Sequence, residues 1–175
     1  MSGPLCYPSD TGSEPSARHV TIQLTQPRSE AHWLRARRLV EEYAASLNLD
    51  LSFQNLQHEL ENLATEYGVP AGAFLVAEED GIYLGCVGVR HLSPEVGEIK
   101  RMYVSPAARG RGSGRLLAEG IVEAAKALGY ARLRLDTLPD MKAAQALYSS
   151  LGFKPIPPYY FNPVSGTVFM ELALS

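Results

Sequence analysis

The sequence is poor in cysteine, with only Cys6 and Cys86 among its 175 residues. Cys6 lies in a polar N-terminal stretch and Cys86 in an apolar one, so the two do not suggest the disulfide framework of a small secreted domain. The first 17 residues lack the basic start and the apolar core of a secretory signal. From these absences we expect a reducing, cytoplasmic setting.

Long hydrophobic runs and a large net charge are also missing. No run of about 18 apolar residues is present, which argues against a transmembrane helix. The net charge is −3, from 16 basic and 19 acidic residues, so the chain as a whole is not suited to bind nucleic acid or an anionic membrane. No cluster of His and Cys has the spacing of metal ligands, and we therefore expect no metal.

One domain accounts for the length of the chain. Residues 1–17 are rich in Ser, Pro and Gly and are predicted to form a flexible tail, whereas residues 18–175 form the domain. Strands are predicted from alternating and apolar segments over 19–24, 73–78, 83–92, 98–104, 132–137 and 167–174. A further short strand near 153–156 is left open. Helices are predicted from apolar residues three and four apart over 29–47, 53–67, 112–128 and 141–151.

The order of these elements indicates an α/β fold. Strand 98–104, helix 112–128 and strand 132–137 make a βαβ unit with parallel strands, whereas the earlier strands are joined by hairpins. We therefore expect a mixed, mostly antiparallel sheet with a parallel pair at its centre and helices on both faces.

The most informative segment joins a predicted strand to a predicted helix over residues 104–115, Val-Ser-Pro-Ala-Ala-Arg-Gly-Arg-Gly-Ser-Gly-Arg. Its glycines let the backbone approach a ligand closely, and the start of the helix points free N–H groups and the positive dipole end at the same place. Arg109, Arg111 and Arg115 add positive charge. The segment therefore predicts a phosphate or pyrophosphate site, although such a loop can also be no more than a tight turn.

Common nucleotide-binding motifs match this loop poorly. A Walker loop ends in Gly-Lys-Ser/Thr, whereas this one ends in Gly112-Ser-Gly-Arg115. A dinucleotide fingerprint needs G-x-G-x-x-G and an acid about 20 residues later. Here the glycines alternate, while Asp136 falls at roughly that distance. A nucleotide-binding module stays open as an alternative.

The spacing Arg109-x-x-Gly112-x-Gly114 resembles the signature of the GNAT superfamily of N-acetyltransferases. That signature reads Arg or Gln, two residues, Gly, one residue, then Gly or Ala. The resemblance extends over about residues 19–175, because the order of elements matches as well. It implies the acyl-CoA N-acyltransferase fold, with residues 18–175 as the GNAT domain.

Two further segments carry the same resemblance. The strand Glu98-Ile-Lys-Arg-Met-Tyr-Val104 resembles the fourth strand of the family. The run Ala144-Gln-Ala-Leu-Tyr148-Ser-Ser-Leu-Gly152-Phe153 resembles its A-x-x-L-Y-x-x-x-G-F segment. Met141 stands seven residues before this Tyr, where the family often has an Asn that contacts the cofactor.

Acetyl-CoA as the donor is what the resemblance implies. Its pantetheine arm would run along Met102, Tyr103 and Val104, between strands 98–104 and 132–137, which would splay apart to admit it. The pyrophosphate would lie on the loop, with contacts from Arg109, Gly110, Arg111, Gly112, Ser113, Gly114 and Arg115.

Acetyl transfer to an amine needs a base, an acid and a donor for the developing oxyanion. Glu98 and Tyr148 occupy the positions of the family's base and general acid. Glu98 can instead be a surface residue paired with Lys100, and Tyr148 a packing residue of its helix. The backbone N–H near Met102 is the expected oxyanion donor.

Two parts of the sequence concern the acceptor. The aromatic loop over 155–163 offers Tyr159 and Asn162 as contacts, or else forms a rigid hinge. Lys100 and Arg101 suggest an acceptor with a carboxylate. We expect a small-molecule amine or a protein lysine to attack directly in a ternary complex. We expect no nucleic acid or membrane partner, and we allow for a homodimer. The alternative on the same fold is a non-catalytic acyl-CoA sensor.

Overall fold

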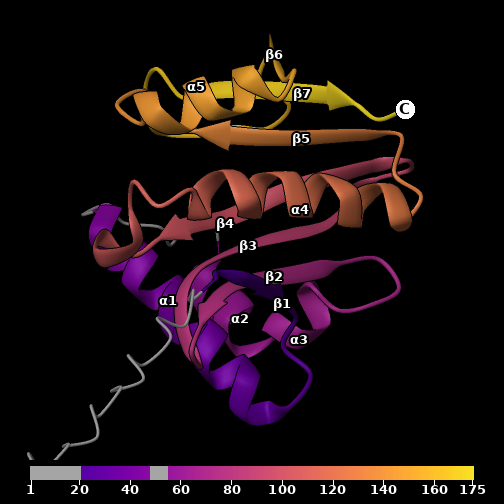
Figure 1. Ribbon diagram of the computed structural model, residues 1–175. Coiled ribbons are helices and arrows are strands. Elements are labelled where there is room, and N and C mark those ends of the chain that lie inside the picture. Colours follow the sequence, from indigo (N-terminus) through magenta and orange to yellow (C-terminus); the bar gives the residue numbers. More distant parts are fainter. Residues whose placement is uncertain (1–20, 48–54) are drawn as a thin grey trace, which may run out of the picture.

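The computed structural model describes residues 21–47 and 55–175 and is built on one seven-stranded sheet (Figure 1). The strand order is β1-β2-β3-β4-β5-β7-β6. The strands are β1 (Gln23–Thr25), β2 (Ala73–Glu79), β3 (Ile82–Ser93), β4 (Val96–Val104), β5 (Arg132–Thr137), β6 (Lys154–Ile156) and β7 (Val168–Ala173). The β4–β5 pair is parallel and the other neighbouring pairs are antiparallel. The mixed, mostly antiparallel sheet predicted from the sequence is confirmed.

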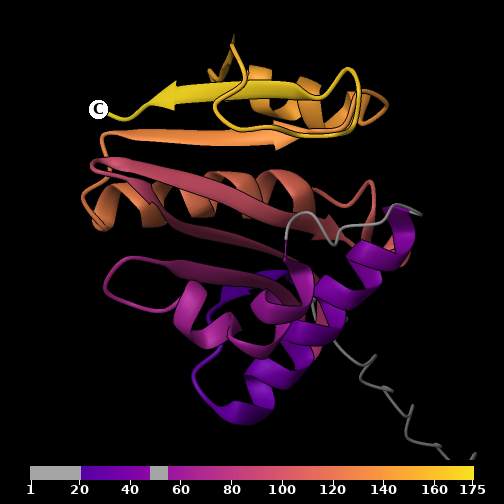
Figure 2. The same cartoon turned by 180° about the vertical axis from the view of Figure 1, so that it is seen from behind.

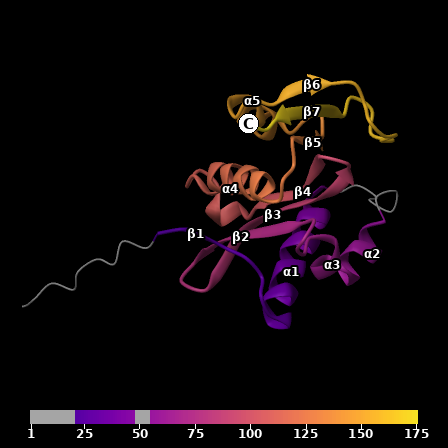
Figure 3. The same cartoon turned by 90° about the vertical axis from the view of Figure 1, so that its right-hand side faces the viewer.

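Helices pack on both faces of this sheet, as expected (Figures 1, 2 and 3). One face carries α1 (Glu30–Leu47), α2 (Leu56–Glu61) and α3 (Leu63–Glu66), and the other carries α4 (Ser113–Ala127) and α5 (Lys142–Ser150). None of the helices in the described part of the chain is long and apolar enough to cross a membrane.

The core consists of two apolar clusters, one on each side of the sheet. Leu117 and Ile121 of α4 are fully buried against β2, β3 and β4. Val40 of α1 and Phe74 of β2 belong to the cluster on the opposite side. Burying a side chain of this size stabilises the fold by about 1.5–3 kcal/mol. The two clusters hold the central strands, and with them the site described below, between two packed layers.

The prediction of one helix over 53–67 is wrong. In the described part of this range, from residue 55 on, the chain forms two short helices, α2 and α3. Asn62 separates α2 from α3 with φ −124° and ψ 22°, outside helical values. Its side-chain amide donates to the carbonyl of His58 at 2.8 Å. An Asn that bonds the local backbone in this way competes with the helical ladder. The apolar spacing continues across the break, so periodicity alone predicts one helix.

The first predicted strand begins later than expected. The interval 19–24 lies partly outside the described residues, and β1 itself runs over Gln23–Thr25. The predicted tail over 1–17 lies wholly outside them. By contrast, the short strand near 153–156 is present as β6.

Strands β4 and β5 part after a short stretch of pairing. Their register joins Val96 to Arg132, Gly97 to Leu133 and Glu98 to Arg134. Both strands continue beyond this point without being paired to each other. The predicted splaying of the central pair is therefore confirmed, and it opens the sheet toward the start of α4.

Candidate active site

A bulge interrupts β4 where it separates from β5. Arg101 and Met102 lie opposite the single residue Val87 of β3, because the register between these strands shifts there. Arg101 has φ +59°, a left-handed conformation that is uncommon for a residue with a side chain. A bulge disrupts the ladder and re-aims backbone groups. The distortion falls beside Met102, where the sequence predicts an oxyanion donor.

A cavity lies between the parted strands. It is lined by Tyr43 of α1, by residues of β4 and β5, and by residues of α5 and its N-cap Met141: Ile99, Lys100, Arg101, Met102, Leu135, Asp136, Thr137, Met141, Ala144 and Tyr148. The fold therefore brings Met102 and Tyr148 to one cavity, although they are far apart in the sequence. Within the described residues, the Thr137 hydroxyl is buried without a hydrogen-bond partner. A ligand that enters the cavity can supply that partner.

The glycine-rich loop ends at the N-terminus of α4. Gly110 and Gly112 have φ +74° and +82°, and a Cβ at either would have no atom of residues 21–47 and 55–175 within 4 Å. The space around this turn is therefore open. Gly112 is the N-cap, and no side chain in the described part of the chain caps the helix. The first N–H groups of α4 are thus suited to bind an anion. Ser113 is buried and its hydroxyl donates to the Ala108 carbonyl at 3.4 Å. Ser113 would therefore bind an anion through its backbone and not through its hydroxyl.

The three arginines of the loop are exposed, and each has a partner within the protein. Arg109 Nε donates to a backbone carbonyl of β4 at 3.3 Å. Arg111 pairs with Glu79, and Arg115 pairs with Glu119 at 3.2 Å. Exposed ion pairs of this kind contribute little to the stability of the fold, and their side chains can readily exchange partners. Their predicted contacts with phosphate stay predictions.

Side chains at the end of β4 differ in their exposure to the cavity. Met102 lines it. Tyr103 is buried on the α1 face, with its ring 5.9 Å from that of Tyr43. Val104 packs against the core cluster on the α4 side. A ligand along this edge would therefore meet the backbone of Tyr103 and Val104 rather than their side chains.

Tyr148 projects from α5 into the apolar side of the cavity. It is 4% exposed, and its ring packs edge-on against Phe153 at a centroid distance of 5.3 Å. Burial raises the pKa of the Tyr148 phenol, and Tyr43 and Asp136 add to the rise. The phenol therefore stays protonated near neutral pH. A protonated hydroxyl on the wall of the cavity is what a general acid requires.

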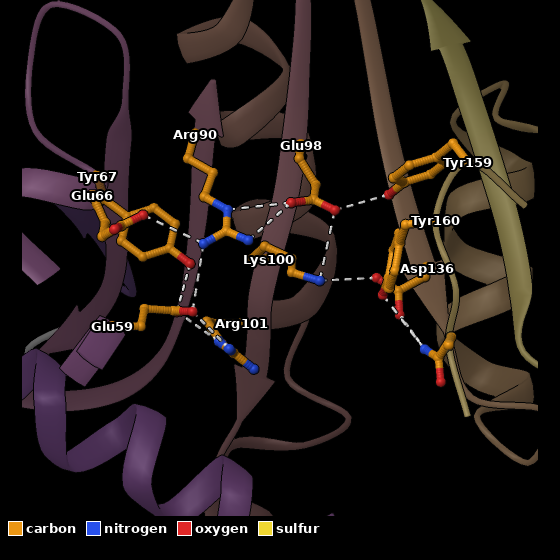
Figure 4. A network of polar contacts seen from close by, with 11 residues as sticks. Glu59, Glu66, Tyr67, Arg90, Glu98, Lys100, Arg101, Asp136, Tyr159 and Tyr160 are labelled. Atoms are coloured by element: carbon orange, nitrogen blue, oxygen red, sulfur yellow. Dashed lines mark hydrogen bonds and ion pairs between the residues drawn. The ribbon is translucent and has the colours of Figure 1, made fainter. Parts of the chain in front are cut away.

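Glu98 is a buried carboxylate held by three neighbours (Figure 4). Arg90 Nε donates to its Oε2 at 3.2 Å and the Tyr159 hydroxyl donates to its Oε1 at 3.0 Å. Lys100 Nζ lies 3.7 Å from Oε1 and only 3.0 Å from Asp136 Oδ1. The ion pair with Lys100 anticipated from the sequence is present, but Glu98 is not a surface residue. Its connection to the cavity runs through Lys100 and Asp136.

The loop between β6 and β7 is hydrogen-bonded to the carboxylates of Glu98 and Asp136. Besides the bond from Tyr159 to Glu98, Asn162 Nδ2 donates to Asp136 Oδ2 at 3.1 Å. The rings of Tyr159, Tyr160 and Phe169 contact one another edge to face, with centroids 5.2 to 5.4 Å apart. Burial and the charge of the nearby Glu98 raise the pKa of Tyr159. Both predicted acceptor residues thus lie beside the carboxylates next to the cavity.

Two cations expected to attract an acceptor carboxylate already bind carboxylates of the chain. Lys100 pairs with Asp136, and Arg101 makes a bidentate pair with Glu59. A carboxylate on the acceptor therefore gains no support from these two residues. Among residues 21–47 and 55–175, no group of three His, Cys, Asp or Glu residues is arranged to hold a metal ion.

Sequence reasoning missed several polar residues of this region. The sequence indicates Asp136 only as the acid of a dinucleotide site, and no motif indicates a role for Glu59, Arg90 or Tyr160. The alternation of β5 places Asp136 on the face opposite Leu135, which is a weak signal. Nothing in the spacing indicates that Asp136 meets Lys100, because that contact depends on how β4 and β5 part.

Comparison with known proteins decides the family. The profile of the acetyltransferase (GNAT) family matches residues 33–153. The chain belongs to the GNAT family. An uncharacterized N-acetyltransferase of Schizosaccharomyces pombe is 45% identical over 139 residues, which cover 78% of this chain and 85% of that protein.

Solved GNAT structures share the fold. An acetyltransferase of Staphylococcus aureus Mu50 matches with a TM-score of 0.73 at 19% identity, covering 89% of this chain and 100% of the other. A Salmonella typhimurium protein solved with its cofactor acetyl-CoA matches with a TM-score of 0.63 at 21% identity, covering 88% and 94%. A dinucleotide fingerprint belongs to a mostly parallel sheet. The mostly antiparallel GNAT sheet therefore removes the dinucleotide alternative for the glycine-rich loop.

Proposed function

We propose that the protein transfers the acetyl group of acetyl-CoA to a primary amine, which attacks the thioester directly in a ternary complex. The observation that carries this proposal is the cavity between β4 and β5, where the bulge at Arg101 and Met102 faces the same space as Tyr148. Family membership supports an acetyl-CoA donor, and the S. typhimurium neighbour was solved with that molecule.

The residues present suit acetyl-CoA. Open space at Gly110 and Gly112, together with the uncapped start of α4, fits a pyrophosphate. The edge of β4 beyond its pairing with β5 offers backbone groups to the amides of the pantetheine arm. The Thr137 hydroxyl, which has no hydrogen-bond partner among the described residues, is a further group for the arm, near Met141, where the family often has Asn.

Three groups of the chain would then divide the chemistry. Acetyl-CoA supplies the acetyl group activated as a thioester. A backbone N–H at the bulge, next to Met102, would donate to the carbonyl oxygen as negative charge develops there. Tyr148 would give its proton to the departing sulfur. Glu98 would take the proton of the amine. Glu98 lies three residues before residue 101, and three steps of about 3.3 Å along β4 make roughly 10 Å. The proton would therefore pass from the amine to Glu98 through a water.

Cys86 is not suited to carry the acetyl group. It is fully buried in β3, and burial raises the pKa of its thiol. Its Sγ donates to the Arg101 carbonyl at 3.4 Å. A thiol that stays protonated is a poor nucleophile. This argues against an acetyl intermediate on Cys86 and so supports direct attack by the amine.

Steady-state kinetics test the proposal against its rival. We expect thiol release from acetyl-CoA to depend on an added amine from a panel of polyamines, amino acids and lysine peptides. Double-reciprocal plots should intersect when both substrates are varied. Parallel lines would indicate an acetyl-enzyme. Tight binding of acetyl-CoA with no release for any amine would favour the non-catalytic sensor.

Gly114→Asp is expected to weaken binding of coenzyme A at least about tenfold, or 1.4 kcal/mol. The new carboxylate would add a negative charge to the first turn of α4, close to the proposed pyrophosphate site. The three atoms nearest to a Cβ at this position belong to side chains of Val104, Leu147 and Met102, at 3.8–3.9 Å, so a Cβ fits there in ordinary contact. Isothermal calorimetry measures the affinity.

Gly114→Asn is the matched control, since it adds the same bulk without the charge. It should lose clearly less affinity than Gly114→Asp. Gly112→Asp should also weaken binding, but φ +82° adds backbone strain to its effect. Unchanged affinity for coenzyme A in Gly114→Asp would remove the pyrophosphate site from this loop.

A further inference from the structure

A buried ion pair connects helix α2 to the bulge in β4 (Figure 4). Arg101 donates from Nε to Glu59 Oε1 and from Nη2 to Glu59 Oε2, each at 2.7 Å. Glu59 and Arg101 are 2% and 5% exposed, so water does not compete for these bonds. Two parallel bonds between a guanidinium and a carboxylate fix both the distance and the orientation of the two groups.

Glu59 is itself held in place by other neighbours. The Tyr67 hydroxyl donates to its Oε1 at 2.7 Å, and Arg90 Nη1 lies 3.6 Å from its Oε2. Burial alone would raise the pKa of Glu59, but the hydrogen bonds from Arg101 and Tyr67 and the positive charges outweigh it and lower the pKa. The carboxylate therefore stays charged at neutral pH, and its geometry is set by α2 and α3.

The conformation of Arg101 needs such support. A residue with a side chain in the left-handed region is strained and persists where its surroundings determine its conformation. Here the side chain is tied to α2 and the backbone carbonyl accepts from Cys86 Sγ at 3.4 Å. Both ends of the residue are thus fixed, directly before Met102.

Stability alone does not require an ion pair here. Replacing a buried ion pair by apolar residues of similar volume is often neutral or stabilising. What an apolar pair would not supply is the fixed orientation of Arg101. The bidentate pair therefore serves the geometry of the bulge.

We propose that Glu59 is a positioning residue for acetyl transfer, acting through Arg101 to hold the bulge so that the backbone N–H next to Met102 points at the thioester oxygen. The inference rests on the proposed function of the cavity. Glu59 is not among the residues that line the cavity and would touch neither substrate. Its removal should therefore impair the reaction and leave the binding of acetyl-CoA intact.

Two variants separate positioning from stability. Glu59→Met combined with Arg101→Met removes the pair and keeps most of the volume, but the buried Tyr67 hydroxyl then loses its acceptor, so the variant should melt below the wild-type temperature. Glu59→Asp keeps the charge but is one methylene too short for both bonds. Each variant is studied at a temperature where circular dichroism shows it folded. Glu66→Gln, which loses the 3.4 Å pair of α3 with Arg90 and leaves the Arg101 pair alone, is the control.

The diagnostic measurement is the infrared carbonyl stretch of bound acetyl-CoA labelled with ¹³C at the thioester. In the wild type we expect a shift to lower frequency from the free value, because the bulge polarises the carbonyl. In the double Met variant the shift should be largely lost, and in Glu59→Asp it should be reduced. We expect kcat to fall about 10- to 100-fold, with the Kd for acetyl-CoA within about twofold of wild type. Glu66→Gln should keep the full carbonyl shift.

The outcomes distinguish this inference from the proposed function. A wild type that does not bind acetyl-CoA removes the proposed function and this inference with it. A wild type that binds and shifts the carbonyl, with folded Glu59 variants that show the same frequency and the same kcat, overturns the inference alone. The Glu59–Arg101 pair would then only stabilise the fold.

Discussion

Tyr148→Phe is expected to lower kcat by about 10- to 1000-fold while leaving the affinity for acetyl-CoA nearly unchanged. The substitution keeps the ring and its edge-on contact with Phe153 and removes only the hydroxyl. Without that proton donor the coenzyme A thiolate must leave unprotonated. Initial rates measure kcat, and isothermal titration calorimetry on the same preparation measures the affinity for acetyl-CoA.

The matched control removes a tyrosine hydroxyl elsewhere in the molecule. Tyr130 donates to the Ala71 carbonyl and is not among the residues lining the cavity. Tyr130→Phe should leave kcat within about twofold of wild type, because its hydroxyl has no part in the reaction. If Tyr148→Phe turned over as fast as the control, the phenol of Tyr148 would be a packing group and the acid would lie elsewhere.

Glu98→Gln is expected to reduce kcat/KM at neutral pH by about 10- to 100-fold and to recover part of the loss at high pH. In the wild type kcat/KM should rise with pH, because a lysine-like amine with a pKa near about 10.4 must lose its proton before it attacks. Gln can still accept from the Tyr159 hydroxyl but cannot take the proton. At high pH the free amine is abundant and the base matters less.

Two further variants decide how the result is interpreted. Glu66→Gln removes another carboxylate that binds Arg90, so it reports what disturbing Arg90 alone does. Asp136→Asn removes the carboxylate that lines the cavity. Superimposable pH profiles for wild type and Glu98→Gln, with a strong loss in Asp136→Asn, would move the role of base from Glu98 to Asp136.

The elements with the strongest periodicity were predictable. Strand β5 and helix α4 lie within a residue of their predicted bounds, because a long apolar stripe and strict alternation have few other interpretations. The division of the predicted helix 53–67 was not predictable, because Asn62 interrupts the backbone without interrupting the apolar pattern. A side chain that bonds its local backbone leaves no mark on periodicity.

In the site, too, residues within one motif were predictable and contacts between distant segments were not. Met102 and Tyr148 lie in contiguous motifs, so the resemblance identified them, and the fold brings them to one cavity. The pairs Glu59–Arg101 and Lys100–Asp136 join residues 42 and 36 positions apart. Such contacts depend on where α2 packs and on where β4 leaves β5. Neither can be derived from the spacing of residues in one segment.

Product analysis with acetyl-CoA labelled in its acetyl group is the most direct test of the central claim. The protein is incubated with labelled acetyl-CoA and the best amine of the panel. The products are separated, identified and quantified by mass spectrometry. We predict one labelled N-acetyl amine for each coenzyme A thiol released, with this product much reduced in Tyr148→Phe. Labelled acetate without an acetylated amine, or bound acetyl-CoA that stays intact with every amine, would contradict it.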